Sequence, residues 1–239
     1  MQDTATSDPA PTILLIGASR GLGHAIAAEF LQKGWNVVGT VRDPHARTPL
    51  HALAGTAGGR LAIETLDIRA PDQIEALDQR LSGRQFEILF VNAGITNRDP
   101  MQTIGEVSTE AFVEVMVTNA LSPMRVIERL ERHVTPAGLI GVMSSGQGSI
   151  ANNQSGQREL YRGSKAALNM FMRSFAARQA HTSRAMVAMA PGWIRTELGG
   201  PEAPLRIEDS IPHLVEVLLA KRDRPGLAYL DYRGRTVPW

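Results

Sequence analysis

The sequence predicts an α/β protein built on one doubly wound parallel sheet, with helices on both faces. Short apolar runs alternate with longer amphipathic stretches along the chain, as successive strand–helix–strand units require. The apolar runs contain few polar residues, Phe86 to Val91 being an example, and such runs are typical of parallel strands that are covered on both sides. A mixed α+β domain is the alternative that this periodicity leaves open.

The expected elements follow one another in a regular order. In the first helix, 21–33, Ile26 and Phe30 mark an apolar face, and the next helix is placed by the spacing of Ile74, Leu77 and Leu81. Further helices are expected over 109–133, 160–180 and 207–220. The strands are expected at 12–16, 36–41, 61–66, 86–91, 139–143, 185–190 and 227–230.

Length and composition favour one soluble domain. No linker divides the 239 residues, so residues 12–239 are expected to form a single domain after a flexible lead-in at 1–11. A net charge of +1 gives no field that attracts nucleic acid or anionic membranes. The chain shows no secretory signal, no apolar stretch near the ~20 residues that span a bilayer, and no cysteine. We therefore expect a cytoplasmic protein that binds neither nucleic acid nor membranes.

The histidines give no sign of a metal site. There are six, without the spacing of metal ligands, and no His-Glu-x-x-His pattern occurs. His24, His133 and His181 are interpreted as solvated helix residues, and no metal is expected.

A glycine-rich turn joins the first strand to the first helix. It comprises Gly17, Ala18, Ser19, Arg20, Gly21, Leu22 and Gly23. Glycines let the backbone turn sharply and approach a pyrophosphate, whose charge the free amides of the helix N-terminus attract. This is the phosphate-binding turn of a Rossmann-type fold. The alternative is a turn that serves only tight strand–helix packing.

The end of the second strand indicates which dinucleotide binds. An acidic residue there usually holds the ribose 2′-hydroxyl of NAD, but this chain has Val41 followed by Arg42. A guanidinium suits a 2′-phosphate, and Arg20 in the glycine turn is a second candidate. We therefore expect NADPH/NADP⁺. The alternative is that both arginines are solvated, with Asp43 pairing with Arg42.

Ser145, Tyr161 and Lys165 form the candidate catalytic group. Tyr161 and Lys165 are four residues apart, on one face of the expected helix. An adjacent ammonium favours phenolate, so Lys165 is expected to lower the pKa of Tyr161 and make it a better proton donor. Ser145 follows the fifth strand and is placed to donate a hydrogen bond to a substrate carbonyl.

The order of these motifs resembles the short-chain dehydrogenase/reductase family over nearly the whole chain. The shared motifs are the glycine turn, Asn92-Ala93-Gly94, Asn119, Ser145 with Tyr161 and Lys165, and the segment from Pro191 to Thr196. Within the family, the chain is most similar to the sniffer-like and C-factor-like carbonyl reductases. This similarity is carried by residues 144–150, Gly192-Trp193, Gly199-Gly200 and the ending Val237-Pro238-Trp239.

The resemblance implies a role for each matching residue. Tyr161 would protonate the carbonyl oxygen, Ser145 would orient it, Lys165 would hold the nicotinamide ribose, and Asn119 would fix a water that relays protons. The remaining implied cofactor contacts are Asp67 and Ile68 at the adenine, Asn92, Ala93 and Gly94 at the adenosine ribose, and Pro191, Gly192, Ile194 and Thr196 near the carboxamide and phosphates.

Two departures from the family pattern stand out. Ile16 replaces the usual threonine before the glycine turn, which puts local rigidity in question more than cofactor binding. The spacing from Ser145 to Tyr161 is longer than usual, as it is in the sniffer-like subgroup, and the added polar segment 152–159 is expected near the mouth of the active site.

Substrate and partner contacts are expected around this site. The substrate candidates are Ser145, Gln147, Tyr161, Trp193 and Leu198, with residues 198–205 as a mobile lid. For Trp193 a purely structural role is equally open.

Assembly is expected to be a homodimer, with a tetramer as an alternative. Helices 109–133 and 160–180 are expected to meet their copies through Ala166, Ala167, Phe171 and Phe175. The alternative is that these residues pack on their own sheet.

The predicted function is an NADPH-dependent carbonyl reductase that converts a ketone, aldehyde or quinone to an alcohol. Two alternatives remain: an NAD(P)-dependent alcohol dehydrogenase that runs toward oxidation, and a non-catalytic nucleotide-binding signalling protein of the C-factor type. Because Asn119, Ser145, Tyr161 and Lys165 are all present, the sequence favours an enzyme over the signalling protein.

Overall fold

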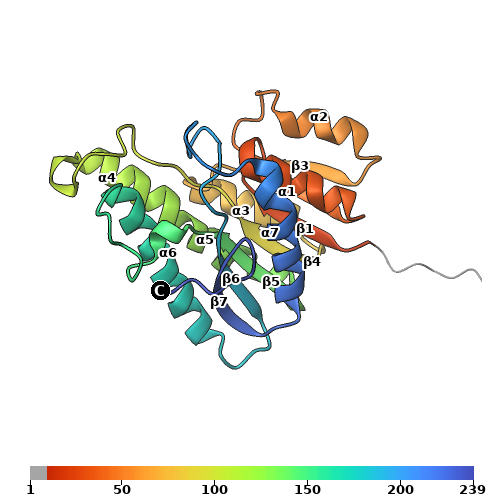
Figure 1. The fold of residues 1–239 in the computed structure, drawn as a ribbon. Helices are drawn as coiled ribbons and strands as arrows, with labels where there is room; N and C mark the ends of the chain where they lie inside the picture. Colours follow the sequence, from red (N-terminus) through yellow and green to blue (C-terminus); the bar gives the residue numbers. More distant parts are fainter. Residues whose placement is uncertain (1–9) are drawn as a thin grey trace, which may run out of the picture.

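A single seven-stranded parallel sheet organises the chain (Figure 1). The computed structural model describes residues 10–239, so most of the expected lead-in 1–11 lies outside the described residues. The strand order is β3-β2-β1-β4-β5-β6-β7, and every neighbouring pair is parallel. This confirms the predicted fold class. The strands are β1 (Thr12–Ile16), β2 (Asn36–Val41), β3 (Leu61–Thr65), β4 (Phe86–Val91), β5 (Val134–Met143), β6 (Ala185–Ala190) and β7 (Gly226–Asp231).

Helices cover both faces because side chains alternate along each strand. In β1, Ile13 and Leu15 pack with one hydrophobic cluster, and Leu14 and Ile16 pack with the other. The first cluster lies under α1 (Gly21–Gln32), α2 (Pro49–Thr56) and α7 (Ile207–Arg222). The second lies under α3 (Pro71–Arg80), α5 (Ser122–Leu130) and α6 (Glu159–Arg178). In Figure 1, α1 and α7 lie side by side across one face, and they pack directly against each other.

The prediction of one continuous helix over 109–133 is wrong in detail. The segment contains α4 (Thr109–Met116), a π-turn at Val117–Leu121, α5 and a short 3₁₀ turn at Glu131–His133. Pro123 has no N–H and cannot continue the usual helical hydrogen bonds across this turn. Wide turns of this kind are common at functional sites, and this one contains Asn119.

Two further elements differ from the sequence prediction. Helix α2 was not predicted, since its eight residues are too few to show a clear apolar period; Thr48 and His51 cap it reciprocally. Strand β5 begins at Val134, five residues before the expected start at 139, because Val134 pairs with Phe86 across a register irregularity.

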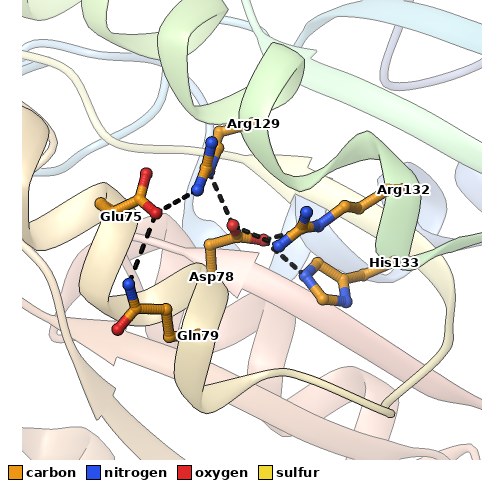
Figure 2. A network of polar contacts seen from close by, with 6 residues as sticks. All are labelled: Glu75, Asp78, Gln79, Arg129, Arg132 and His133. Atoms are coloured by element: carbon orange, nitrogen blue, oxygen red, sulfur yellow. Dashed lines mark hydrogen bonds and ion pairs between the residues drawn. The ribbon is translucent and has the colours of Figure 1, made fainter.

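His133 is not solvated as predicted. It is 5% exposed, and its Nε2 lies 2.7 Å from Oδ1 of Asp78, a fully buried carboxylate on α3. Figure 2 shows Arg129 and Arg132 meeting the same carboxylate, with Nε–oxygen distances of 2.6 and 2.9 Å. The network joins α3 to the end of α5. The other two histidines differ, because His24 is half-buried and His181 is exposed.

The faces expected at a subunit interface are only partly available. Phe175 is 1% exposed and belongs to the core of its own chain, so its predicted interface role is wrong. Phe171, four residues earlier, is exposed, and Ala166 and Ala167 are half-buried. Phe171 and Phe175 are four residues apart and lie on neighbouring positions of α6. Phe175 points into the core, and Phe171 lies where this face of the helix becomes exposed.

The described residues contain neither a membrane-spanning helix nor a cluster of metal-ligating side chains. Among residues 10–239, no helix is both long and apolar enough to cross a membrane. Within the same part of the chain, no group of three or more His, Asp or Glu side chains is arranged to hold a metal ion.

Candidate active site

The predicted site residues gather at the carboxyl edge of the sheet. The loops that follow β1, β4, β5 and β6 leave this edge, since all four strands are parallel. Strand β1 pairs with β2 on one side and with β4 on the other, so the strand order reverses here. Ligands of open α/β sheets bind at such a reversal.

The glycine turn is tightly packed on one side and open on the other. A Cβ on Gly17 would lie 2.9 Å from Ala93, and one on Gly23 would lie 2.0 Å from the Gly17 carbonyl oxygen. Gly17 and Gly21 have φ of 85° and 56°, which favours glycine at both positions. Around a Cβ on Gly21 nothing lies within 4 Å. The close packing fixes the turn, and the open side leaves room for a ligand.

The start of α1 is suited to an anion. Its N-cap residue, Arg20, has an extended backbone and makes no side-chain capping bond, so the first amides of the helix remain available. Such amides bind phosphate with the help of the helix dipole. Ser19 and Leu22 flank this start in the same turn. The chain therefore fits the pyrophosphate of a dinucleotide.

Thr40 supplies a contact that the sequence analysis missed. Its Oγ1 accepts a hydrogen bond from the Gly17 amide at 2.9 Å, and its carbonyl accepts one from Ala18 at 2.8 Å. Asn92 donates to the Gly17 carbonyl at 2.7 Å from the other side. Ile16, which replaces the usual threonine, is fully buried in the core. Local rigidity thus comes from β2 and β4.

Arg42 directly follows β2, at the carboxyl edge of the sheet. It lines a cavity of about 450 Å³ between β2, β3 and α3. Among residues 10–239 it forms no ion pair, and Asp43, its expected alternative partner, accepts a hydrogen bond from the His45 amide at 2.8 Å instead. Arg80 lines the same cavity but is paired with Glu64 at 2.8 Å.

Arg20 is engaged elsewhere. Its guanidinium lies 2.9 Å from the carboxylate of Glu197, and both side chains are exposed. Glu197 belongs to the segment that follows β6, so the pair bridges the glycine turn and the expected lid. An exposed pair of this kind contributes little to stability, and a bound phosphate would compete with Glu197 for the guanidinium.

Asp67 and Ile68 lie after β3, as predicted, but in different environments. The Asp67 amide donates to Gln73 Oε1 at 2.8 Å, and its carboxylate accepts a hydrogen bond from the Arg69 amide at 2.9 Å. Ile68 is 5% exposed and packs in the core under α3. The Asp67 side chain is the more accessible of the two.

Two of the catalytic candidates, Asn119 and Lys165, meet at Gly94. A Cβ at this position would lie 3.3 Å from both Asn119 Oδ1 and Lys165 Nζ, so only glycine leaves both polar atoms undisturbed. Asn119 is fixed by a reciprocal pair of 2.8 Å hydrogen bonds with the Ile95 backbone and by a 3.0 Å bond to Ser164. The π-turn thus joins the loop after β4 to α6.

Lys165 is buried next to Tyr161. Its Nζ donates to the Met143 carbonyl at 2.9 Å and lies 5.8 Å from the centre of the Tyr161 ring. Only 3% of Lys165 is exposed. Burial disfavours the ammonium form and lowers the pKa of Lys165 to about 8.

Tyr161 does not have the lowered pKa that the sequence analysis expected. Burial raises the pKa of this phenol, and a hydrogen bond with Ser145 and the charge of Arg158 offset the rise only in part. In this structure the desolvation of the ring outweighs nearby positive charge. Tyr161 therefore holds its proton at neutral pH.

The hydrogen bonds that hold the backbone of Ser145 and the side chain of Ser144 were not predicted. The Tyr229 hydroxyl donates to the Ser145 carbonyl, and the Ser144 hydroxyl donates to Asn169 Oδ1 at 2.7 Å. Asn169 lies four residues after Lys165 on α6, so helical spacing could have indicated it. Tyr229 is 84 residues from Ser145, and no local pattern connects the two.

The substrate candidates lie in different parts of the structure. Trp193 is 53% exposed, with its Nε1 donating to the Gly199 carbonyl at 2.7 Å, and Leu198 is also exposed. The backbone N–H of the half-buried Gln147 donates to Ser145 Oγ at 3.1 Å, and its side-chain Oε1 is buried without a hydrogen-bond partner among residues 10–239. Gln147 is thus placed beside Ser145, whereas Trp193 lies on the segment after β6.

The segment after β6 is folded on itself. Ile194, which is 3% exposed, pairs with Leu205, and the Thr196 hydroxyl accepts a hydrogen bond from the Gly199 amide at 3.1 Å. The Pro191 carbonyl accepts a 2.6 Å bond from Ser210 on α7, and Gly192 has φ of 92°. The Thr196 side chain already has a partner within the segment.

Comparisons with known proteins identify the family. The family model for short chain dehydrogenases matches residues 11–204. The chain belongs to the short-chain dehydrogenase family.

The solved structures of the short-chain dehydrogenase family include similar chains. A Burkholderia multivorans protein described as a short-chain dehydrogenase/reductase, with bound NADP, is 72% identical, with a TM-score of 0.96 over 97% of this chain and 100% of that chain. A carbonyl reductase of Pseudomonas aeruginosa in complex with NADP is 36% identical, with a TM-score of 0.89 over 97% of this chain and 100% of that chain.

A relative also supports the predicted subgroup. The C-signal protein of Myxococcus xanthus is 32% identical over 155 residues, which are 64% of this chain and 92% of the relative. The resemblance stated from the sequence motifs is thereby confirmed, and the chain is an oxidoreductase of this family.

Proposed function

We propose that this oxidoreductase is a carbonyl reductase that uses NADPH to convert ketones, aldehydes or quinones to alcohols. The observation that carries the proposal is the grouping of Asn119 and Lys165 at Gly94, with the Tyr161 ring centre 5.8 Å from Lys165 Nζ. Ser145 joins them through its hydrogen bond with Tyr161. These four residues supply a proton, a hydrogen-bond donor and a positive charge in a buried place.

Tyr161 is the residue that we assign to proton transfer. Its raised pKa keeps the phenol protonated at neutral pH, so it has a proton to give to the carbonyl oxygen. Ser145 would donate to the same oxygen as negative charge develops there. The Lys165 ammonium would stabilise the phenolate that remains. When bound, NADPH supplies the hydride that the carbonyl carbon accepts.

We assign NADPH rather than NADH because of the charges at the adenosine end. Arg42 lines a cavity there without a carboxylate partner among residues 10–239, and Arg20 lies in the glycine turn. A 2′-phosphate would form charge-assisted hydrogen bonds with such guanidinium groups. The similar proteins of B. multivorans and P. aeruginosa were both solved with NADP, which supports the same cofactor here.

The test is the oxidation of reduced nicotinamide, followed by absorbance with NADPH and NADH separately. The panel contains aromatic aldehydes, α-diketones, ortho-quinones and β-keto esters, and Tyr161→Phe is the control. We expect turnover with NADPH that falls at least about 10²-fold in the variant. Faster conversion of the matching alcohols at neutral pH would favour the oxidative alternative. NADPH binding without turnover of any carbonyl would favour the signalling alternative.

We also propose a homodimer that forms through α4 and α6. Apolar side chains that a second copy would cover are exposed on α4 (Phe112 and Val113), on the π-turn that follows it (Leu121) and on α6 (Met170 and Phe171). Analytical ultracentrifugation tests this assembly.

The cytoplasmic location stays a prediction of the sequence.

A further inference from the structure

Arg158, the residue before α6, adopts an unusual backbone conformation next to the active site. Its φ of 59° and ψ of 42° are left-handed, and no other non-glycine residue in the range 10–239 has a positive φ. This conformation is unfavourable for a residue with a Cβ. It persists where the surroundings enforce it, which is frequent at ligand sites.

Hydrogen bonds on both sides hold this conformation. The following residue, Glu159, accepts a 2.9 Å hydrogen bond from the Ile104 amide in the loop after β4. Arg162 donates through Nε to the Gln157 carbonyl at 2.6 Å and through Nη2 to Ser155 Oγ at 2.8 Å. A change of the backbone at Arg158 would disturb these contacts, so the direction of its side chain is fixed.

The Arg158 side chain lies over the ring of Tyr161. Its Cζ is 5.3 Å from the ring centre. The side chain is half-buried, and its Nε is buried without a hydrogen-bond partner among the described residues. The adjacent carboxylate, Glu159, accepts its hydrogen bond from the Ile104 amide. A positive charge with a buried, unsatisfied donor thus lies beside the reacting phenol.

A buried donor without a partner is costly, and such groups in native proteins call for an explanation. Gln147 presents a second unsatisfied buried atom, its acceptor Oε1, on the residue whose amide contacts Ser145. Both unsatisfied groups therefore belong to residues in contact with the catalytic pair Ser145 and Tyr161. The Arg158 guanidinium forms no ion pair among residues 10–239, so a substrate that carries an anionic group near its carbonyl would pair with it.

We propose that Arg158 is a specificity-determining residue that binds the carboxylate of an oxo-acid substrate while Tyr161 and Ser145 hold its carbonyl. The proposal rests on the reductase function above and narrows its substrate class. Arg158 also acts on Tyr161, since burial raises the pKa of the phenol and the guanidinium charge opposes the rise. Loss of the charge would therefore affect every substrate slightly, and anionic substrates strongly.

The test compares matched pairs of substrates: phenylglyoxylate, 3-carboxybenzaldehyde and 4-carboxybenzaldehyde, each against its methyl ester. Arg158→Gly removes the guanidinium and accepts the left-handed backbone, and Arg158→Lys keeps a charge. The control is Arg84→Gln, because Arg84 also lies over an aromatic ring, 5.5 Å from the centre of Phe86, but before β4 at the opposite edge of the sheet.

We expect the wild type to prefer at least one acid over its ester. In Arg158→Gly, kcat/KM for that acid should fall about 10- to 100-fold, mainly through KM, because a charge-assisted hydrogen bond is lost. The ester should change less than about threefold, Arg158→Lys should be intermediate, and Arg84→Gln should match the wild type. Parallel losses for acid and ester, or no acid preference in the wild type, would overturn the proposal.

Benzoate binding gives a readout that needs no turnover. Calorimetry in the presence of NADP⁺ should show binding to the wild type and at least about tenfold weaker binding to Arg158→Gly. Equal affinities would overturn the carboxylate site. If the wild type turns over neither these six substrates nor any carbonyl of the panel above, the reductase function fails, and the benzoate measurement decides the carboxylate site separately.

Discussion

Asp78 offers the sharpest test of how the helices beneath the active site are held. This fully buried carboxylate on α3 meets Arg129, Arg132 and His133 at the end of α5 (Figure 2). Asp78→Asn keeps the shape of the side chain and removes its charge. Removing one partner of a buried ion pair costs about 3–5 kcal/mol. The arginine side chains are 40% and 60% exposed, so water can solvate them, and we expect about 2–3 kcal/mol.

The assay is urea unfolding at pH 7, with thermal unfolding as a second measurement. For a chain of this size, the expected loss corresponds to a decrease in Tm of about 4–12 °C. The control is Glu75→Gln, which removes the half-exposed carboxylate that pairs with Arg129 in the same network and should cost less than about 1 kcal/mol. Equal losses in both variants, or less than about 1 kcal/mol in Asp78→Asn, would refute the reasoning.

The pH dependence of this stabilisation follows from the direction in which the pKa of Asp78 is shifted. Burial of Asp78 opposes ionisation, but hydrogen bonds from His133 and Arg132 and the charge of Arg129 outweigh it, so the pKa lies below the ordinary value. The stabilisation is therefore complete above the unfolded-state pKa of about 4, and it is lost as the pH falls toward the lower folded-state pKa. The difference between wild type and Asp78→Asn should shrink below about pH 4.

Three further predictions concern the cofactor, the site and the assembly. Arg42→Gln should raise the KM for NADPH about 10- to 100-fold without a comparable effect on the KM for NADH. The control, Arg80→Gln in the same cavity, should leave the KM for NADPH unchanged. Equal effects of Arg42→Gln on NADPH and NADH would contradict the 2′-phosphate assignment. Because the pKa of Lys165 lies near 8, its positive charge is lost above that pH. Binding of the reduced cofactor to the wild type, measured by fluorescence titration, should therefore weaken above pH 8. Binding to Lys165→Met should show no such step. Phe171→Glu should convert a dimer to a monomer in analytical ultracentrifugation with Tm unchanged at low protein concentration, and a wild-type monomer would refute the interface.

The sequence by itself determined the fold class and the order of the site motifs, because both depend on local patterns. Apolar runs located the sheet, and the glycine turn required a conformation that Gly17 and Gly21 accept. Spacing along one helix placed Lys165 beside Tyr161. Parallel strands then bring their carboxyl ends to one edge, so the chemistry of the site could be predicted before its geometry was known.

The tertiary structure alone decided the electrostatic balance and the long-range contacts. Burial raises the pKa of Tyr161 although cations lie nearby, and desolvation depends on the whole surrounding core rather than on spacing. His133 is buried because Asp78, 55 residues away, meets it. Arg158 lies over Tyr161 because its left-handed backbone is held by contacts with distant loops. A sequence pattern reports neighbours along the chain, whereas these effects arise from neighbours in space.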